Sequence, residues 1–428
     1  MNAKQMERCR ARFEQFVDDI LTPLGRRDRR HWSAVYVRGL LLDGERKSIE
    51  PLARRLPDGN VQALQQVVGQ SPWPVEPVRE RLGQHLAEAL SPGSAWVVDE
   101  VGFPKQGTHS VGVARQYSGT LGKVGNCQVA VSLHYTTEDG SLPVDWRLYL
   151  PERWTQDPAR CRKAGVPADV RFQPKWELAL ACCDQALAWG IPPGVVLADA
   201  VYGKVTEFRT GLEARRLAYV VDIDPTLTVW TTPQRRTPVP ARGRGRPPKP
   251  RYMGPPPESV ATVATRLPAR AWRTVRWREG TKGGLENRFA ACRVQPAHGY
   301  RAGAPELPVG WLLIEWPPDA DAPAKYWLSN LPPTTPLRRL VRWAKTRWRI
   351  EQDYRQAKRE LGLDHYEGRS WLGWHHHVTL TMVAYGFLML ERLRTQKNFW
   401  VDLPENASCP PSPAGHVDRG VPHVRPAS

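Results

Sequence analysis

The sequence predicts an α/β protein in which helices pack on a mixed sheet. Short apolar runs that end in an acid predict buried strands, and the two clearest runs end in Asp99 and Asp199. Other segments have apolar residues three and four positions apart, as amphipathic helices do. The resulting order of three strands, helix, strand, helix and strand is typical of a layered α/β domain.

The first 88 residues predict an all-α domain. Apolar residues recur at helical spacing in four segments, Arg10–Leu24, Trp32–Leu42, Ser48–Leu56 and Val61–Val68. Basic clusters at 26–30 and 54–55 interrupt this pattern. A helical DNA-binding domain and a helical dimerisation module both fit such a sequence.

Residues 92–224 predict the first part of the α/β core. The expected elements are, in chain order, Ala95–Asp99, Asn126–Tyr135, Val144–Leu150, Trp176–Ala188, Val195–Asp199, Lys204–Leu217 and Ala218–Ile223. Glycine and proline bound the strands, and Gly190 and Pro192 end the first helix.

A β-rich insertion is predicted at residues 225–331. It begins with a basic loop rich in Pro and Gly, which includes Arg242, Arg244 and Arg246. An Arg-Gly-Arg-Pro motif in this loop either reads an A·T-rich minor groove or attracts phosphates in general. Short apolar runs later in the insertion predict strands.

The chain is expected to return to the core after the insertion. Helical patterns at 335–361 and 379–394 predict that residues 335–395 form the second part of the core. Residues 396–428 are rich in proline and predict a flexible tail.

The composition favours a polyanionic partner. The 61 Lys and Arg residues exceed the 43 Asp and Glu residues, and the net charge of +18 favours DNA or RNA over a membrane. The seven cysteines include no Cys-x-x-Cys pair, so a zinc ribbon is not expected. The sequence predicts no leader and no bilayer span, and we expect a cytoplasmic protein.

Three acids are the candidate catalytic residues. Asp99 and Asp199 each end a predicted strand, and such ends converge on one edge of an open α/β sheet. Glu351 lies in a predicted helix, on the same face as Arg347 and Lys358. Three carboxylates suffice to hold two Mg²⁺ ions for a phosphoryl displacement. The alternatives are helix-capping or turn roles for the aspartates and exposed ion pairs for Glu351.

Three segments together form a specific combination. They are Val97–Gly107 around Asp99, Leu197–Gly203 around Asp199, and the spacing Arg347-x3-Glu351-x6-Lys358. With the insertion before the last acid, they resemble the transposases of bacterial insertion sequences in the DDE superfamily, over roughly residues 10–395. The resemblance implies a retroviral-integrase or RNase H-like core. It makes the three acids the metal-binding catalytic triad, with Mg²⁺ as cofactor and Mn²⁺ as a substitute.

The resemblance also implies contacts with DNA. Arg347 and Lys358 match the basic positions of the family's Tyr-x2-Arg-x3-Glu-x6-Lys signature, which contact phosphates at the transposon ends. Ala344 stands at the Tyr position, so the role of that Tyr is lost or is supplied by Trp343, Trp348 or Tyr354. Apart from the resemblance, Lys105, six residues past Asp99, either contacts DNA or faces solvent, and the arginines of the basic loop are further candidate DNA contacts.

We therefore expect a DNA transposase. It would cut DNA at terminal inverted repeats and then join the freed 3′-hydroxyl to target DNA, both at one triad. Bringing two ends together implies a homodimer in a synaptic complex, associated with a bacterial nucleoid. The alternatives are a Mg²⁺-dependent nuclease without strand transfer and a transposase-derived DNA-binding protein with an inactive site.

Other acids have simpler explanations. Glu100 would point away from Asp99 along a strand, which predicts a structural role. Asp222 and Asp224 end another predicted strand and compete with Asp199 for the role of second acid. The Tyr-Gly pair that follows Asp199 favours Asp199.

Histidines and tryptophans complete the candidates. His375, His376 and His377 would point about 100° apart on a helix, which favours helix-start or DNA-facing roles over a metal site. Tryptophans in the insertion are expected to pack in its core rather than to stack on a flipped base, namely Trp311, Trp316 and Trp327.

Overall fold

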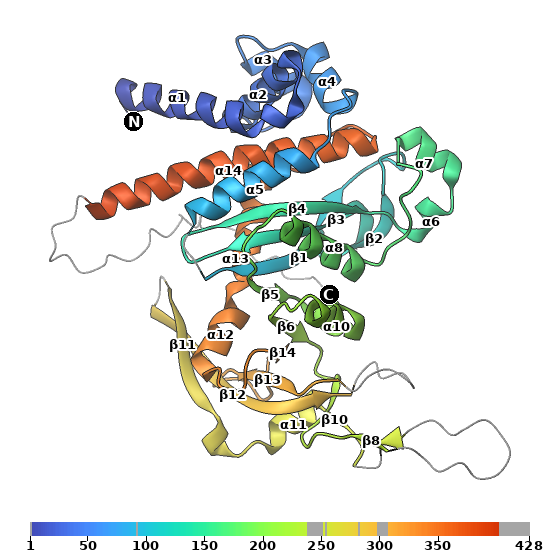
Figure 1. Ribbon diagram of the computed structural model, residues 1–428, viewed down its shortest axis with the longest axis vertical. Helices are drawn as coiled ribbons and strands as arrows, with labels where there is room; N and C mark the ends of the chain where they lie inside the picture. The colour runs from blue at the N-terminus through green and yellow to red at the C-terminus, as the bar shows by residue number, and fades with distance from the viewer. Residues whose placement is uncertain are drawn as a thin grey trace, which may run out of the picture.

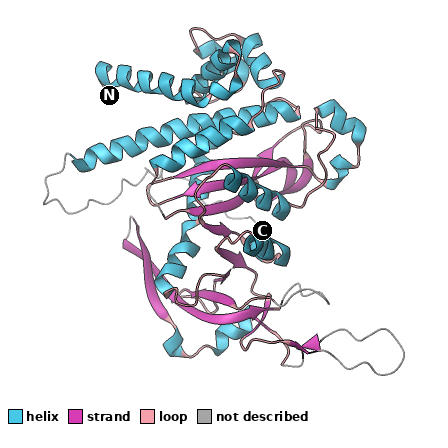
Figure 2. Ribbon diagram, in the orientation of Figure 1, coloured by secondary structure: helices cyan, strands magenta, loops and turns pink. Residues whose placement is uncertain are grey.

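The computed structural model confirms the α/β class, with a large sheet and helices packed against it (Figures 1 and 2). It describes residues 2–90, 93–237, 251–252, 255–280, 283–297 and 307–401. None of the helices in these ranges is long and apolar enough to cross a membrane.

Helices fill the first 90 residues. They are α1 (Ala3–Ile20), the 3₁₀ turn η1 (Thr22–Leu24), α2 (Arg27–Leu41), α3 (Ile49–Arg55), α4 (Val61–Gly69) and α5 (Glu76–Ala89). Asn2 and Asn60 cap α1 and α4 through their side-chain oxygens. The four predicted helices are present with shifted ends. α5 is an additional helix, and its buried residues Val78, Leu82 and Leu86 lie four residues apart.

Strands and helices alternate in the next part of the chain. The strands are β1 (Ala95–Pro104), β2 (Ala114–Ser118), β3 (Lys123–Thr136), β4 (Ser141–Tyr149), β5 (Val195–Ala198) and β6 (Tyr219–Ile223). The helices are α6 (Glu152–Thr155), α7 (Pro158–Ala164), α8 (Lys175–Ala188), α9 (Ala200–Gly203) and α10 (Thr206–Ala214).

The predicted end of β1 at Asp99 is wrong. The strand continues to Pro104 because its residues from Glu100 onward still pair with β3, down to Pro104↔Cys127. Asp99 therefore lies in the middle of β1, although its parallel neighbour β5 ends nearby.

Short strands and one helix follow β6. They are β7 (Thr228–Trp230), β8 (Arg236–Thr237), β9 (Arg251–Tyr252), β10 (Glu258–Ser259), α11 (Val260–Arg266), the 3₁₀ turn η2 (Ala269–Ala271), β11 (Arg273–Gly280), β12 (Gly283–Pro296), β13 (Gly310–Trp316) and β14 (Lys325–Ser329). Most of them join the core sheet, because β14 pairs with β6 from Tyr326↔Ile223 to Ser329↔Val220.

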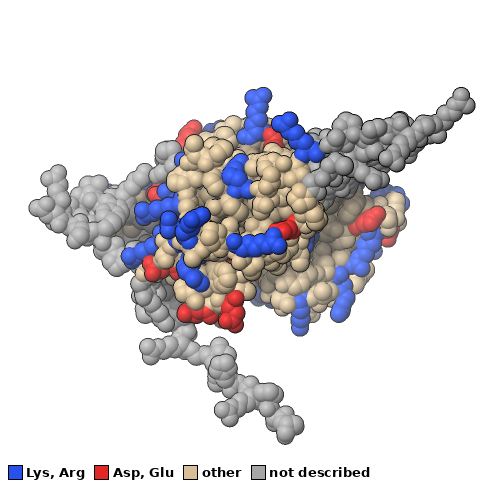
Figure 3. Space-filling view, turned by 90° about the horizontal axis from the view of Figure 1, so that it is seen from below, with Lys and Arg blue, Asp and Glu red and all other residues tan. Residues whose placement is uncertain are grey.

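On the face of the molecule seen from below, Lys and Arg side chains are more widespread than Asp and Glu side chains (Figure 3).

The main sheet is mixed. In the described part of the chain it has twelve strands, in the order β10-β7-β12-β13-β14-β6-β5-β1-β3-β2, with β11 on β12 and β4 on β3. β5 pairs in parallel with both β1 and β6, and the other neighbours pair antiparallel. The parallel strands thus lie where the core meets the insertion.

Three helices close the fold: α12 (Leu337–Thr346), α13 (Trp348–Arg359) and α14 (Trp371–Val401). The prediction of one helix over 335–361 is wrong, because the helix is interrupted at Arg347. The two halves contact different strands of the sheet: α12 contacts β11 and β12 of the insertion and β5 and β6 of the core, and α13 contacts β1 and β4. α14 begins earlier than predicted and lies beside α5 over the core strands (Figure 1).

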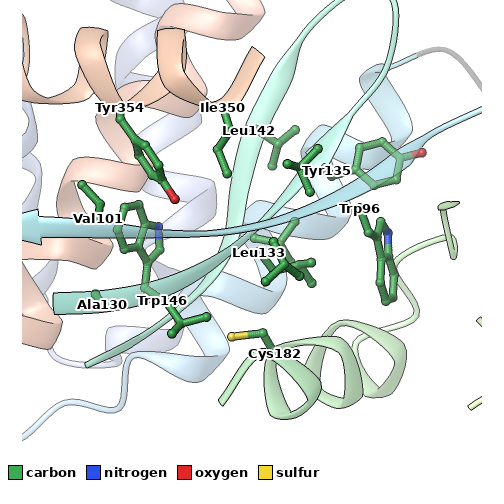
Figure 4. Packing of buried hydrophobic residues seen from close by; sticks show 14 of the residues in the cluster. Trp96, Val101, Ala130, Leu133, Tyr135, Leu142, Trp146, Cys182, Ile350 and Tyr354 are labelled. Atoms are coloured by element: carbon green, nitrogen blue, oxygen red, sulfur yellow. The ribbon is translucent and has the colours of Figure 1, made fainter. Parts of the chain in front are cut away.

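The core fixes α13 to the sheet. Ile350 and Tyr354 of α13 pack on the same side of the sheet as α14, next to Trp146 of β4 (Figure 4). The rings of Tyr354 and Trp146 lie with centroids 5.8 Å apart. Cys182 of α8 packs on the opposite side (Figure 4). The helix that carries Glu351 is thereby attached to the strands that carry the other candidate acids.

Candidate active site

The register of the parallel strands brings Asp99 and Asp199 together. β1 and β5 pair from Ala95↔Val195 to Val97↔Leu197. Two residues further along each strand, the same register places Asp99 level with Asp199. Because neighbouring strands are about 4.8 Å apart, the two aspartates lie side by side.

Asp199 is held at the end of β5 by the helix that follows it. Its Oδ1 accepts hydrogen bonds from Val201 N at 2.9 Å and Tyr202 N at 3.4 Å, so it caps the short helix α9. Among the described residues, no hydrogen bond reaches its second oxygen, Oδ2. The capping role predicted as the alternative is therefore present, and it leaves one oxygen available for a ligand.

Asp99 is buried, with 8% of its surface exposed. Its Oδ2 accepts a hydrogen bond from Arg347 Nη1 at 3.0 Å, and its Oδ1 accepts one from Glu100 N at 2.8 Å. Burial raises the pKa of Asp99 to about 7, the positive charge of Arg347 opposes this, and the negative charge of Asp199 adds to it.

Glu351 approaches the site from α13 and contacts it through Arg347. Its Oε1 lies 3.9 Å from Arg347 Nη2, and its side chain is 62% exposed. Arg347 stands between α12 and α13, and its guanidinium contacts Asp99 on one side and Glu351 on the other. The structure thus brings together Asp99, Asp199, Arg347 and Glu351, with Arg347 between the two acids that it contacts.

Asp222 is a further acid at this edge of the sheet. β5 and β6 pair in parallel up to Ala198↔Val221, so the next residues, Asp199 and Asp222, are also level. Burial raises the pKa of Asp222, and the charge of Arg347 opposes the rise. Three aspartates therefore form a row across β1, β5 and β6. The sequence signal for Asp222 is the one that singles out Asp199, an acid at the end of a buried strand.

A buried network attaches α13 next to this row. Tyr354 Oη and Ser132 Oγ share a hydrogen bond of 2.7 Å, and Ser132 is the β3 partner of Asp99. Asp353, which is buried, accepts hydrogen bonds from His134 Nδ1 and Tyr385 Oη, each at 2.9 Å, and from the Ser141 hydroxyl. These bonds fix the first turns of α13 and so position Glu351.

The two candidate lysines are bonded to the protein itself. Lys358 Nζ donates to Gly102 O at 2.8 Å and to Thr120 Oγ1 at 2.7 Å. Lys105 Nζ donates to Tyr366 O at 2.5 Å. Burial lowers the pKa of both lysines. Arg242, Arg244 and Arg246 lie outside the described residues.

The ligand types at this edge are those that divalent metal ions prefer. Carboxylate oxygens are the ligands that Mg²⁺ prefers, and Asp99 and Asp199 lie side by side with Glu351 close by. In the described part of the chain, no three His, Cys, Asp or Glu side chains are close enough together to hold one ion. The guanidinium of Arg347 lies between Asp99 and Glu351 and marks a position where these carboxylates stabilise positive charge.

The remaining acids have structural partners. Glu100 Oε2 lies 2.5 Å from Lys175 Nζ on α8, in agreement with a structural role. Asp224 forms an ion pair of 3.3 Å with Lys204 and is 43% exposed.

The histidines lie near the start of α14, as one of the two predicted roles has it, but the DNA-facing role is wrong for His376 and His377, because both side chains lie in the interior. His376 contacts Val68 O and Trp73 O through its two nitrogens, and His377 contacts Leu363 O and the Tyr36 hydroxyl. His375 Nδ1 contacts Trp371 O. His376 and His377 thus connect α14 to other elements through carbonyls and a hydroxyl, whereas the contact of His375 lies within α14.

The insertion tryptophans pack against protein groups. Trp327 is 1% exposed, and Trp316 contacts Trp272 with ring centroids 5.3 Å apart. Arg293 lies over the Trp311 ring at 5.0 Å. This agrees with the predicted packing role.

Two comparisons with known proteins bear on this site. The profile of the DDE superfamily endonucleases matches residues 19–284, more than half of the chain, including Asp99 and Asp199. A probable transposase for insertion sequence element IS701 from Microchaete diplosiphon is 29% identical over 187 residues. That alignment covers 43% of this chain and 46% of the relative, so it spans about half the length of the curated protein.

Proposed function

The chain belongs to the DDE superfamily of endonucleases, and we propose that it is a DNA transposase of an insertion sequence. It would hydrolyse a phosphodiester at the terminal inverted repeats and then transfer the freed 3′-hydroxyl end to target DNA. The observation that carries this proposal is the register that sets Asp99 beside Asp199, with Arg347 linking Asp99 to Glu351. The IS701 relative supports the choice of a transposase.

In this proposal Asp99, Asp199 and Glu351 hold two Mg²⁺ ions, or Mn²⁺ in their place. The chemistry that such ions supply is activation of the attacking oxygen and stabilisation of the leaving oxygen. Asp199 offers its uncapped oxygen, and Asp99 is fixed in a strand that pairs on both sides. The buried bonds of Asp353 and Tyr354 hold the helix of Glu351 in place.

Cations around the triad would bind the phosphates of the DNA end. Arg347 lies between two acids of the triad, Lys358 of α13 bonds to Gly102 O of β1, and Lys105 follows the last residue of β1. The bonds of Lys358 and Lys105 to backbone carbonyls can be replaced by bonds to phosphate oxygens. Such bonds are stronger because the phosphate acceptor is charged. Arg242, Arg244 and Arg246 are proposed as additional phosphate contacts. Holding two ends at once requires at least a homodimer on DNA.

The test is cleavage and joining by purified wild type and by Asp99→Asn and Glu351→Gln variants. The substrate is a duplex that carries the end of the element encoding the chain, with Mg²⁺ present. We expect both variants to bind the duplex as wild type does and to lose cleavage and joining by at least about 1,000-fold, since each removes a metal ligand. Asp224→Asn, an exposed aspartate paired with Lys204, is the matched control and should keep its activity.

Each alternative function has its own outcome. Wild type that cuts but never joins a pre-cut 3′-hydroxyl end to a plasmid would be a nuclease without strand transfer. Wild type that binds the ends but never cuts them would be a DNA-binding protein with an inactive site. Cleavage that survives in the Asp99→Asn variant would refute the proposed triad.

A further inference from the structure

A groove is lined by residues of α4, α7 and the segment before α14. These elements lie near one another at the upper right of Figure 1. The groove has a volume of about 620 Å³, and its walls come from the α2–α4 helices, the β1–β2 connection, α7 and residues 365–370. A second hollow of about 560 Å³ lies against α6 and α7. His109, Arg160 and Lys163 line both, so the two hollows form one extended trough around α7, the α7 groove.

Cations line the α7 side of this groove. The guanidinium of Arg160 lies 3.7 Å from the centroid of the Trp154 ring and donates to Thr108 O at 2.8 Å. These two contacts hold it in place and leave further N–H donors free. Lys163 and Arg153 are exposed, and within the described ranges neither forms an ion pair or side-chain hydrogen bond. Burial lowers the pKa of Arg160, and the charge of Arg153 lowers it further, so the two cations repel each other.

Acids compensate this charge only in part, since Asp157 is the one acid that lines the hollow beside α6 and α7 in the described residues. The Asp157 carboxylate caps α7 by accepting a hydrogen bond from Arg160 N at 2.9 Å. Glu367 pairs with Arg46, and Glu50 lies on the opposite wall, on α3. The cations of α6 and α7 therefore present a positive strip, which an extended anion complements better than a compact one.

The α7 groove continues the strand that carries Asp99. Lys105 lies six residues beyond Asp99, which at about 3.3 Å per residue is roughly 20 Å along the strand direction. Its ammonium donates to the carbonyl of Tyr366, a residue that lines the groove. In the same region Val111 N donates to Arg369 O, which links the β1–β2 connection to the groove wall. At about 3.4 Å per base pair, 20 Å corresponds to roughly six base pairs of duplex.

We propose that the α7 groove binds the backbone of the subterminal duplex, from about six base pairs inside the cleaved bond. Arg153, Arg160 and Lys163 contact its phosphates along the α6 and α7 side of the groove. This inference rests on the proposed function, because it takes the duplex to end at Asp99. It assigns α6 and α7 a role in gripping DNA that does not involve the chemistry at the triad.

The test is binding without metal, measured by fluorescence anisotropy of an end duplex in EDTA. We compare wild type with an Arg160→Ala/Lys163→Ala double variant and with the control Arg162→Ala, which removes an exposed cation of α7 that lines neither hollow. Each phosphate contact contributes about 0.9 to the slope of log K against log salt. A fourfold rise in salt concentration should therefore lower the DNA affinity of the double variant about tenfold less than that of wild type, because two contacts are missing. The control should follow wild type.

Neutral methylphosphonates locate the contact. When they are placed roughly six to nine base pairs from the cleaved bond, they should lower the affinity of wild type for the duplex and leave the affinity of the double variant unchanged. An unchanged salt slope, or the same methylphosphonate penalty in both proteins, overturns the proposal. A double variant that binds DNA normally but changes its oligomeric state in light scattering also overturns it, since the groove would then bind a second copy. If wild type cleaves DNA and the double variant binds DNA as wild type does, the proposal for the groove is refuted and the proposed function is not. If binding depends on the groove but wild type never cleaves, the proposed function is refuted and the proposal for the groove is not.

Discussion

His377 provides a direct test of how α14 is joined to α2 and to the segment after α13. Its ring is 1% exposed, and its nitrogens face Tyr36 Oη of α2 at 2.9 Å and Leu363 O, beyond α13, at 3.1 Å. In the neutral ring, Nε2–H donates to Leu363 O and Nδ1 accepts from the Tyr36 hydroxyl. Protonation of Nδ1 removes the acceptor for the Tyr36 proton, so the buried contact requires the neutral form.

The cost of acid follows from this burial. Burial lowers the pKa of His377 from 6.5 to about 4, and the charges of Lys105 and His365 also oppose protonation. The unfolded chain therefore takes up this proton at a higher pH than the folded chain. The contribution of neutral His377 to the free energy of unfolding is fully present above about pH 6.5. It falls as the pH drops towards 4 and is constant below that pH. The full loss is about 3 kcal/mol, of which about 2 kcal/mol falls between pH 7 and pH 5.

The variant His377→Gln tests this reasoning. Gln keeps a donor and an acceptor but takes up no proton, so its free energy of unfolding should fall about 2 kcal/mol less than that of wild type between pH 7 and pH 5. Urea unfolding at constant ionic strength measures both values. His85→Gln, which removes a histidine with an exposed side chain from α5, is the control. An equal loss in wild type and His377→Gln would refute the argument that His377 is neutral in the folded protein.

Two further variants test the carboxylates near the catalytic row. Asp222→Asn should slow DNA cleavage about 10- to 100-fold, because it removes a carboxylate beside Asp199 and Arg347. An equal loss in Asp224→Asn would contradict a specific role. Lys345→Ala should lower the free energy of unfolding by about 3–5 kcal/mol, because it leaves Glu315, 3% exposed, without its ammonium partner at 2.5 Å. The double variant Lys345→Met/Glu315→Leu should recover most of this loss in urea unfolding, and no recovery would contradict the explanation.

The local character of the core could be predicted from the sequence. The runs that end in Asp99 and Asp199 form strands because they are apolar on both faces, and the sheet is covered on both sides there. The N-terminal helices follow from the same kind of local pattern. In each case, side chains a few residues apart determine the element.

Features that depend on distant contacts could not be predicted in this way. Residues 335–361 have an unbroken helical pattern, yet the helix is interrupted at Arg347, where the guanidinium bonds to Asp99. His376 and His377 are polar in sequence but buried, because carbonyls and a hydroxyl from other elements satisfy them. The level positions of Asp199 and Asp222 depend on the register of β5 and β6, which no single strand encodes.

The charges around Arg347 support the proposed metal site at this edge of the sheet. Asp99, Asp199 and Asp222 lie level on three adjacent strands, and Glu351 approaches from α13. Two unit charges about 5 Å apart repel each other by roughly 3 kcal/mol at an effective dielectric constant of 20. Arg347 supplies one positive charge near these carboxylates. One positive charge does not balance four carboxylates, so neighbouring carboxylates still repel each other. A divalent ion reduces that repulsion more than another basic side chain would, because it places two charges within reach of the same oxygens.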